Sequence, residues 1–244
     1  MGFLEHLDEL RTRIIRAGIG LGIGMVIAFA FYQRLGDFVL QPILASLPAG
    51  SVLVFIKPGE AFSFYLNVSL IGGLLLSAPF VMYQVWRFIA PGLYANEKRL
   101  AIPFVLFTTI GFLLGALFNH YISFPFMMAF FASFNNAELA FMPKLDDVFG
   151  LYTKMLLGMG VVFQMPTVVF FLAKMKMITA RFLLKHFKYA FLIIFIVAAV
   201  ITPTGDMMTQ TIFAAPMVGL YILSIIIAWV VGPKRLRADA DELA

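Results

Sequence analysis

Two acidic residues stand out because each lies among basic residues beside an apolar stretch. Glu9 precedes Arg13 by four positions, and Glu97 is followed at once by Lys98 and Arg99. A carboxylate can bind a guanidinium group through two parallel hydrogen bonds, so such an acid is a candidate receptor for a cationic partner. Simpler roles stay open for both. Glu9 can form an ion pair with Arg13, and Glu97 can stabilise the first turn of a helix.

Three further polar residues fall inside or beside apolar runs. Gln164 lies within the stretch 161–166, and Asp206 and Gln210 lie near a turn late in the chain. A polar side chain inside a membrane is costly, which makes Gln164 a candidate functional residue. A local hydrogen bond is the alternative, because Pro166 frees a backbone carbonyl one turn earlier. Asp206 can likewise be a helix N-cap and nothing more.

The residues that usually bind metals or carry out catalysis are sparse. Cysteine is absent, and His6, His120 and His186 lie in three different segments without ligands at metal spacing. No nucleophile triad, phosphate-binding loop or dinucleotide fingerprint is present. We therefore predict no metal, no cofactor and no enzymatic activity.

The composition predicts an all-α polytopic membrane protein. Of its 244 residues, 62% are hydrophobic and 13% are charged, whereas about 25% are charged in ordinary soluble domains. Several apolar runs approach the ~20 residues that cross a bilayer. They are apolar on every face, which favours helices over barrel strands. Six spans are predicted: Ile14–Phe31, Phe62–Phe88, Ala101–Phe124, Val148–Ala173, Tyr189–Ile201 and Thr211–Val231.

Basic residues predict the orientation of these spans. Positive charge favours the cytoplasmic side, and the formal net charge of +5 then reflects topology instead of binding to nucleic acid. Both termini are therefore expected in the cytoplasm. The basic residues assigned to that side are Arg11, Arg13, Arg16, Arg87, Lys98, Arg99, Lys174, Lys176, Arg181, Lys185, Lys188, Lys234, Arg235 and Arg237, and those assigned to the other are Arg34, Lys57, Lys144 and Lys154.

The chain is predicted to form one membrane domain, 1–244. An amphipathic cytoplasmic helix (1–13) leads into the six-span bundle (14–231), and a cytoplasmic tail (232–244) follows. The fifth and sixth spans are expected to be short helices of a tight hairpin. The connections Gly36–Ala61 and Pro125–Asp147 are expected to be loops that pack as a cap on the outer face.

Four motifs occur in an order that resembles the TatC family of the twin-arginine protein translocase. They are His6–Arg11 with Arg13, Pro58–Phe62, Ala78–Tyr94 followed by Glu97–Arg99, and Thr202–Asp206 with Gln210. Each match alone is weak. Their order along nearly the whole chain, on six spans with both ends inside, is specific.

The resemblance implies a function. TatC proteins recognise the paired arginines of a signal peptide and support export of folded proteins across the inner membrane, driven by the proton-motive force. Glu9 and Glu97 match the two acids of the family's arginine-binding site. The supporting motif residues are Arg13, Phe88, Pro91, Asp206 and Gln210. The implied partners are TatA- and TatB-type single-span proteins, signal peptides, membrane lipid and further copies of the chain.

One position departs from the family pattern. The family usually has glutamate where this chain has Gln164, within Phe163–Pro166. Glutamine keeps the shape and the hydrogen-bonding capacity but has no ionisable proton. The main alternative function is a small-solute or ion transporter that uses Gln164 and Asp206. The absence of an internal repeat counts against it, because many transporters carry one.

Overall fold

The computed structural model describes residues 3–48, 51–89, 101–136, 138–202 and 206–232. Within these ranges the regular elements are all helices, as the composition predicts. They are α1 (Phe3–Phe29), α2 (Tyr32–Ala45), α3 (Glu60–Ile89), α4 (Ala101–Phe118), the π-helix η3 (Asn119–Ser123), α5 (Phe124–Ala132), α6 (Leu145–Val162), α7 (Met165–Lys174), α8 (Ala180–Lys185), α9 (Phe187–Ile201) and α10 (Met207–Val231).

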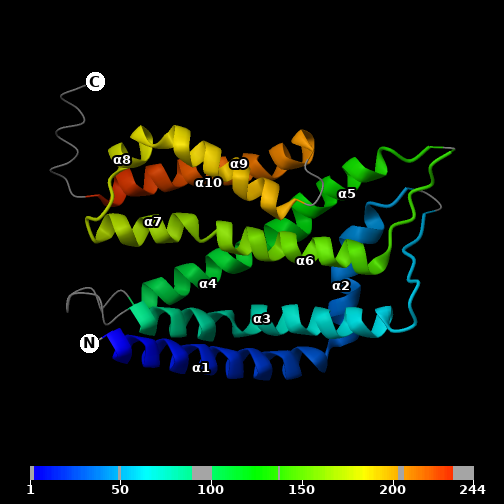
Figure 1. Ribbon diagram of the computed structural model, residues 1–244, viewed down its shortest axis with the longest axis horizontal. Coiled ribbons are helices and arrows are strands. Elements are labelled where there is room, and N and C mark those ends of the chain that lie inside the picture. Colours follow the sequence, from blue (N-terminus) through cyan, green and yellow to red (C-terminus); the bar gives the residue numbers. More distant parts are fainter. Residues whose placement is uncertain (1–2, 49–50, 90–100, 137, 203–205, 233–244) are drawn as a thin grey trace.

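Six membrane crossings account for all of these helices except α2 and α8. Five segments are long and apolar enough to span a bilayer: Glu5–Phe29, Glu60–Ile89, Ile102–Ala132, Leu145–Lys174 and Met207–Val231. The sixth is the shorter α9, with 15 residues. The third crossing combines α4, η3 and α5, and the fourth combines α6 and α7. The first described residues of α1 and the last of α10 lie at the same end of the bundle (Figure 1).

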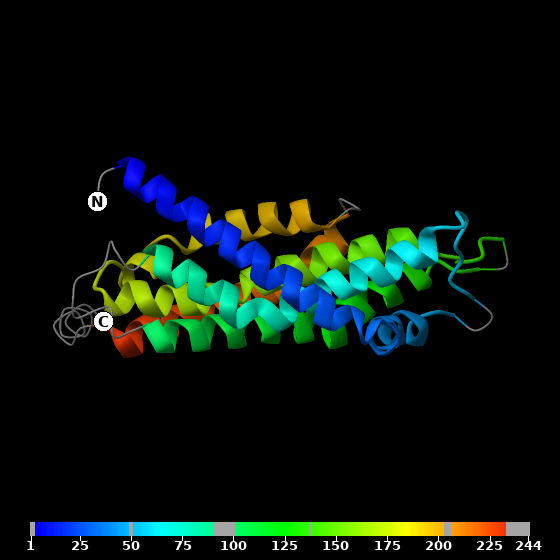
Figure 2. The same ribbon diagram turned by 90° about the horizontal axis from the view of Figure 1, so that it is seen from below.

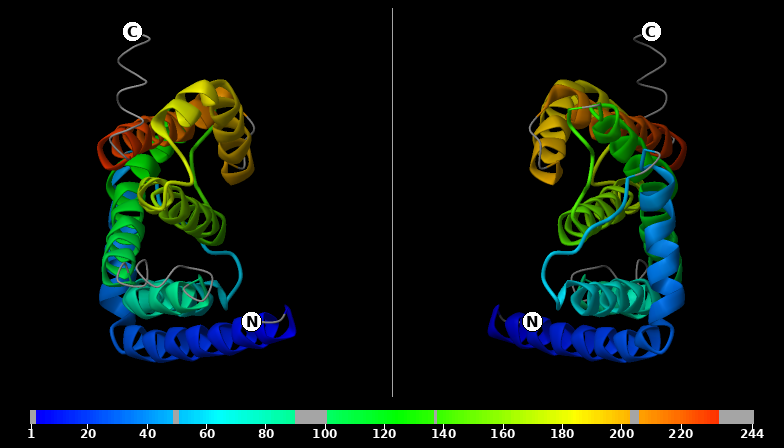
Figure 3. Two further views of the ribbon diagram at one scale, coloured as in Figure 1. Left: turned by 90° about the vertical axis from the view of Figure 1, so that its left-hand side faces the viewer. Right: turned by 90° about the vertical axis from the view of Figure 1, so that its right-hand side faces the viewer.

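The helices lie along a curve when the bundle is viewed from its ends. Figure 3 shows α1 and α3 at one edge, α9 at the opposite edge, and α6 and α7 between them. The helix α1 crosses α3 at an angle and diverges from it toward the chain's start (Figure 2). Buried side chains of α6, α9 and α10, among them Met155, Ala198 and Phe213, form the main core with those of α3 and α5.

Two expected loops are partly helical. The connection Gly36–Ala61 contains most of α2, and the connection Pro125–Asp147 begins with α5. Pro42 lies in the expected loop, yet it is buried in α2 with Gly36, Val39 and Ile43, at the spacing of one helix face. The apolar stretch after Ser123 simply continues the preceding helix through a π-helical turn. Glycine and proline therefore do not predict a loop reliably where tertiary packing buries them within a helix.

The hairpin of α9 and α10 also differs from the expectation. The fifth crossing is short, as expected, but α10 has 25 residues and is long enough to span the membrane. Its first residue is Met207, four positions before the predicted start, because the Asp206 carboxylate caps it. Figure 1 shows the hairpin stopping short of the end where α5 and α6 meet their connection.

The two long connections, which were expected to pack as a cap, contact each other at the end opposite to the start of α1. Backbone hydrogen bonds join Val54 N to Pro143 O at 3.2 Å and Leu145 N to Val54 O at 2.8 Å. Lys144 Nζ lies 3.1 Å from a carboxylate oxygen of buried Glu60, whose other oxygen accepts from Ile56 N. The Glu60 carboxylate raises the pKa of Lys144. This ion pair attaches the connection Pro125–Asp147 to the first turn of α3.

Close packing of α1 on α3 depends on two glycines. A Cβ atom added at Gly24 would lie 2.6 Å from the Gly73 carbonyl oxygen, and one added at Gly73 would meet the backbone of Met25. Small residues allow helix backbones to approach in this way in membranes. By contrast, a Cβ atom at Gly18 or Gly22 would meet nothing within 4 Å. The four glycines of α1 therefore do not share one role.

Replacing Gly24 with alanine should separate these roles. Gly24→Ala is expected to destabilise the fold by about 1–3 kcal/mol, because the new methyl group forces two backbones apart. Gly22→Ala is the matched control, and it should be neutral or slightly stabilising. Unfolding of the purified protein in detergent measures both. Equal stability of the two variants would contradict the close approach.

Candidate functional site

A network of polar side chains joins α1 to α3 near the start of the chain. Arg13 Nη2 donates to Glu9 Oε1 at 3.0 Å within α1, and Arg13 Nη1 donates to Gln84 Oε1 on α3 at 3.4 Å. The Glu9 and Arg13 side chains are 15% and 12% exposed, and Gln84 is 4% exposed. The local ion pair anticipated from the sequence therefore exists, and it is tied to a second helix.

The ion pair leaves part of each partner unused. Glu9 Oε2 and Arg13 Nε are both buried, and neither has a hydrogen-bond partner among the described residues. An unsatisfied buried polar atom costs about 1–3 kcal/mol, and more when the group is charged. The arrangement is monodentate, whereas arginine and a carboxylate can pair through two parallel bonds. Glu9 therefore keeps an unused acceptor beside Arg13, but this oxygen is buried, so a further donor reaches it only if the surrounding side chains move.

The other predicted residues of this site are described only in part. The Phe88 ring stacks on the His6 ring, with centroids 4.4 Å apart and planes 21° apart, which adds a second link between α1 and α3. Pro91 and Glu97 lie outside the described residues. The described ends that flank them, Ile89 of α3 and Ala101 of α4, lie at the same end of the bundle as the first residues of α1 (Figure 1).

Gln164 joins two crossings from the break between α6 and α7. Its Nε2 donates to Thr108 O of α4 at 3.0 Å and to Gly160 O at 3.4 Å. The second bond is local, but its acceptor is Gly160 O and not the Val162 carbonyl that Pro166 frees one turn earlier. Its Oε1 is buried and has no hydrogen-bond partner among the described residues. The donor side of this amide is thus used within the chain, and the acceptor side is left over.

Asp206 and Gln210 hold the hairpin of the last two crossings. The Asp206 carboxylate accepts from Thr209 N at 2.7 Å and from the Thr209 hydroxyl, which makes it the N-cap of α10. Gln210 Nε2 donates to Phe195 O of α9 at 2.7 Å. Both residues are accounted for by helix capping and helix pairing, and neither lies in the network around Glu9.

Gln84 is a residue of the network that the sequence analysis did not single out. It is an amide within an otherwise largely apolar helix, and this is the criterion that drew attention to Gln164. The same criterion, applied to α3, would have identified Gln84. Its partner was not foreseeable, because the contact with Arg13 depends on the register of α1 against α3.

The geometry favours recognition of a cation over catalysis or metal binding. Among the described residues no group of three or more histidine, cysteine, aspartate or glutamate side chains is placed to hold a metal ion. What the site offers is an anchored carboxylate with an unused oxygen, at the end of the bundle where α3 ends and α4 begins.

Comparisons with known proteins identify the family. The family model described as Sec-independent protein translocase protein (TatC) matches residues 5–216. The chain belongs to the TatC family. It is 41% identical to the Sec-independent protein translocase protein TatC of Koribacter versatilis, over 99% of this chain and 91% of that one. It is 42% identical to that of Desulforapulum autotrophicum, over 98% of this chain and 87% of that one.

Solved structures agree. A crystal structure titled as the twin-arginine translocase receptor TatC matches with a TM-score of 0.78 at 36% identity, covering 91% of this chain and 97% of that chain. A second TatC structure, in the detergent DDM, matches with a TM-score of 0.79 at 34% identity. As a TatC-family protein, this chain is a multi-pass membrane component of a protein translocase and not an enzyme. The solute-transporter alternative is set aside.

A double-mutant cycle tests the link between α1 and α3. Gln84→Met should destabilise the protein by about 1 kcal/mol, because Arg13 loses its hydrogen bond to the second helix. The loss should be absent when Arg13 is already replaced by glutamine, since the two residues interact directly. Gln33→Met, at an exposed amide that bonds only its neighbour Tyr32, is the control. Additive effects of the Arg13 and Gln84 substitutions would show that the contact does not exist.

Proposed function

We propose that this TatC-family chain is the signal-peptide receptor of a twin-arginine translocase in the cytoplasmic membrane. It recognises paired arginines and supports the export of folded proteins, powered by the proton-motive force. The observation that carries the proposal is the unused, buried oxygen of the Glu9 carboxylate. A solved relative, 36% identical, is titled as the twin-arginine translocase receptor, which supports the same reading.

In this proposal one arginine of the signal peptide binds Glu9 and the other binds Glu97. A guanidinium group fits a carboxylate through two parallel bonds, and the lysine ammonium group does not reproduce that geometry. Two charge-assisted contacts supply about 3–6 kcal/mol. That corresponds to roughly millimolar affinity, so the apolar part of the signal peptide must add contacts with the crossings of the complex.

Both termini face the cytoplasm in this proposal. The start of α1 and the end of α10 share one end of the bundle. Arg87 and Lys174 lie in the last turns of helices that end on that side, as the preference for positive charge on the cytoplasmic side requires. The site of Glu9 then faces the compartment from which a precursor protein arrives.

The partners in this proposal are TatA- and TatB-type single-span proteins. Gln164 is the proposed intramembrane contact, because its Oε1 is a leftover acceptor within apolar surroundings. The atom is buried, so a partner reaches it only if the side chain turns away from Thr108. A polar bond between helices offsets the loss of the internal one. Further copies of the chain belong to the same complex.

Arginine selectivity is the decisive property of the proposed receptor. Glu97→Ala and Glu9→Ala should weaken binding of a twin-arginine peptide by at least tenfold, while a twin-lysine peptide changes much less. Site-specific photocrosslinking from positions beside Glu97 to a twin-arginine precursor measures the same contact in membranes.

Asp8→Ala is the matched control for Glu9→Ala. It removes the same charge from the neighbouring exposed position of α1 and should leave binding unchanged. Unchanged arginine selectivity in both glutamate variants would overturn the proposed site.

Substitutions at Gln164 test the partner contact. Gln164→Leu should reduce co-purification of a TatB-type protein, because no acceptor remains. Gln164→Glu should retain it, because both oxygens accept, although the lost donor to Thr108 O costs about 1 kcal/mol of stability. Thr153→Val removes another buried, unpartnered hydroxyl and is the control. Normal co-purification of the leucine variant would exclude Gln164 from the contact.

A further inference from the structure

We propose that a groove between α4, α7 and α10 binds one acyl chain of an anionic phospholipid, whose headgroup is held by Lys174. The groove has a volume of about 460 Å³ and is separate from the network around Glu9. The proposal does not depend on the signal-peptide function.

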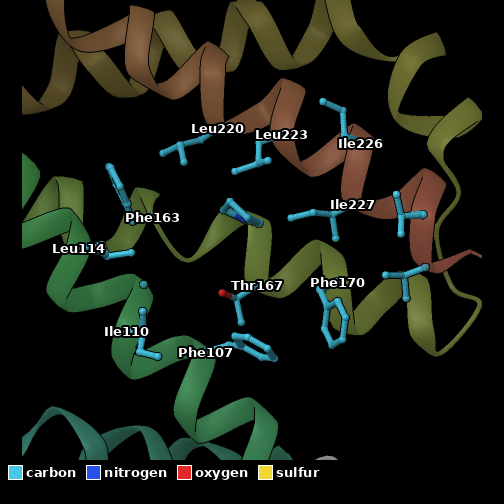
Figure 4. A pocket seen from close by; sticks show the side chains of 14 residues that line it. Phe107, Ile110, Leu114, Phe163, Thr167, Phe170, Leu220, Leu223, Ile226 and Ile227 are labelled. Carbon is cyan, nitrogen blue, oxygen red and sulfur yellow. The ribbon is translucent and has the colours of Figure 1, made fainter.

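The groove lies where α4 and α10 diverge on either side of α7. Figure 4 shows α7 between α10 and α4, with Thr167 and Phe170 of α7 at the centre of the lined space. Ile110 of α4 lies on one side of it, and Leu223 and Ile227 of α10 lie on the other. Among the 14 lining residues, Thr167 alone has a polar side chain. Such a surface suits hydrocarbon.

The groove opens toward the surroundings of the bundle. Several of its walls are exposed in this chain, including Phe107 at 46%, Leu114 at 50% and Ile226 at 52%. In a multi-pass membrane protein those surroundings are lipid, so an acyl chain reaches the groove without any opening of the fold. A chain seated there exchanges mobile contacts with neighbouring lipids for contacts with three helices at once.

A basic residue, Lys174, lies at one end of the groove. Pro166 and Phe170 line it, and Lys174 follows them at the same spacing of four residues, which places all three along one stripe of α7. Lys174 is exposed and is the last residue of the helix. Neither ion pair of the described residues, Glu9–Arg13 or Glu60–Lys144, involves it. Lysine at the end of a crossing extends to the headgroup level and attracts anionic lipid.

The walls fit a flexible chain better than a partner helix. Helices associate in membranes through small residues that let backbones approach. Here the walls carry branched and aromatic side chains, and Gly111 is the one glycine among the lining residues. That glycine is already close to Phe163 O and to the Gln164 and Thr167 side chains, where an added Cβ would lie 3.1–3.7 Å away. An acyl chain can follow these irregular walls, whereas a helix packs best where small residues let the backbones approach.

Lipid retention by the purified protein tests the proposal. Native mass spectrometry of detergent-solubilised protein, supplied with equal phosphatidylglycerol and phosphatidylcholine, should show about fivefold preference for the anionic lipid. Lys174→Gln should abolish the preference while some lipid of either type stays bound. Leu223→Trp should fill the groove and remove the bound lipid.

Two control variants match these substitutions. Lys185→Gln removes a charge at the end of α8, and Leu192→Trp enlarges an exposed leucine of α9 that does not line the groove. Neither should change retention. Equal loss of preference in Lys174→Gln and Lys185→Gln would overturn the headgroup site, and full retention in Leu223→Trp would overturn the groove. Crosslinks from position 223 in native membranes to a single-span protein, with none to lipid, would show that a helix occupies it.

Discussion

The close approach of α1 to α3 at Gly24 and Gly73 sets the register in which Arg13 meets Gln84. Arg13 precedes Gly24 by 11 residues, and Gln84 follows Gly73 by the same 11. Eleven residues are about three helical turns, or about 16 Å, so both side chains return to the facing sides of the two antiparallel helices. A different crossing point would shift Arg13 past Gln84. Arg13 would then lose its hydrogen bond to α3, and Glu9 would no longer be linked to that helix.

The crossing also explains why an arginine occupies this position. Because α1 diverges from α3 toward the start of the chain (Figure 2), the two helices separate on the N-terminal side of their close approach at Gly24. The long side chain of Arg13 spans this separation to Gln84, and its guanidinium group also pairs with Glu9. The widening leaves Glu9 Oε2 without a protein partner, although burial makes such an atom costly. Tight packing at one point and a buried, incompletely bonded polar site farther along follow from the same geometry.

The sequence predicted what depends on local composition and spacing. The apolar runs located all six crossings, and spacing alone indicated the Glu9–Arg13 pair and the Asp206 cap. It failed where long-range packing decides. The segment around Pro42 was expected to be a loop, but it is the helix α2, in which Pro42 is buried. The hydrogen bond from Gln164 to Thr108 joins residues 56 positions apart. No periodicity reports such a pairing, because it follows from which crossings are neighbours.

The presence of Arg13 limits how strongly the proposed site can bind. An arriving guanidinium group shares Glu9 with a cation that is already paired to it, so the new contact is offset by repulsion between the two guanidinium groups. Arg13 cannot move far, because Gln84 holds it. On the proposed function, the result is a receptor that distinguishes arginine by geometry while binding it weakly enough for release, which a transport cycle requires.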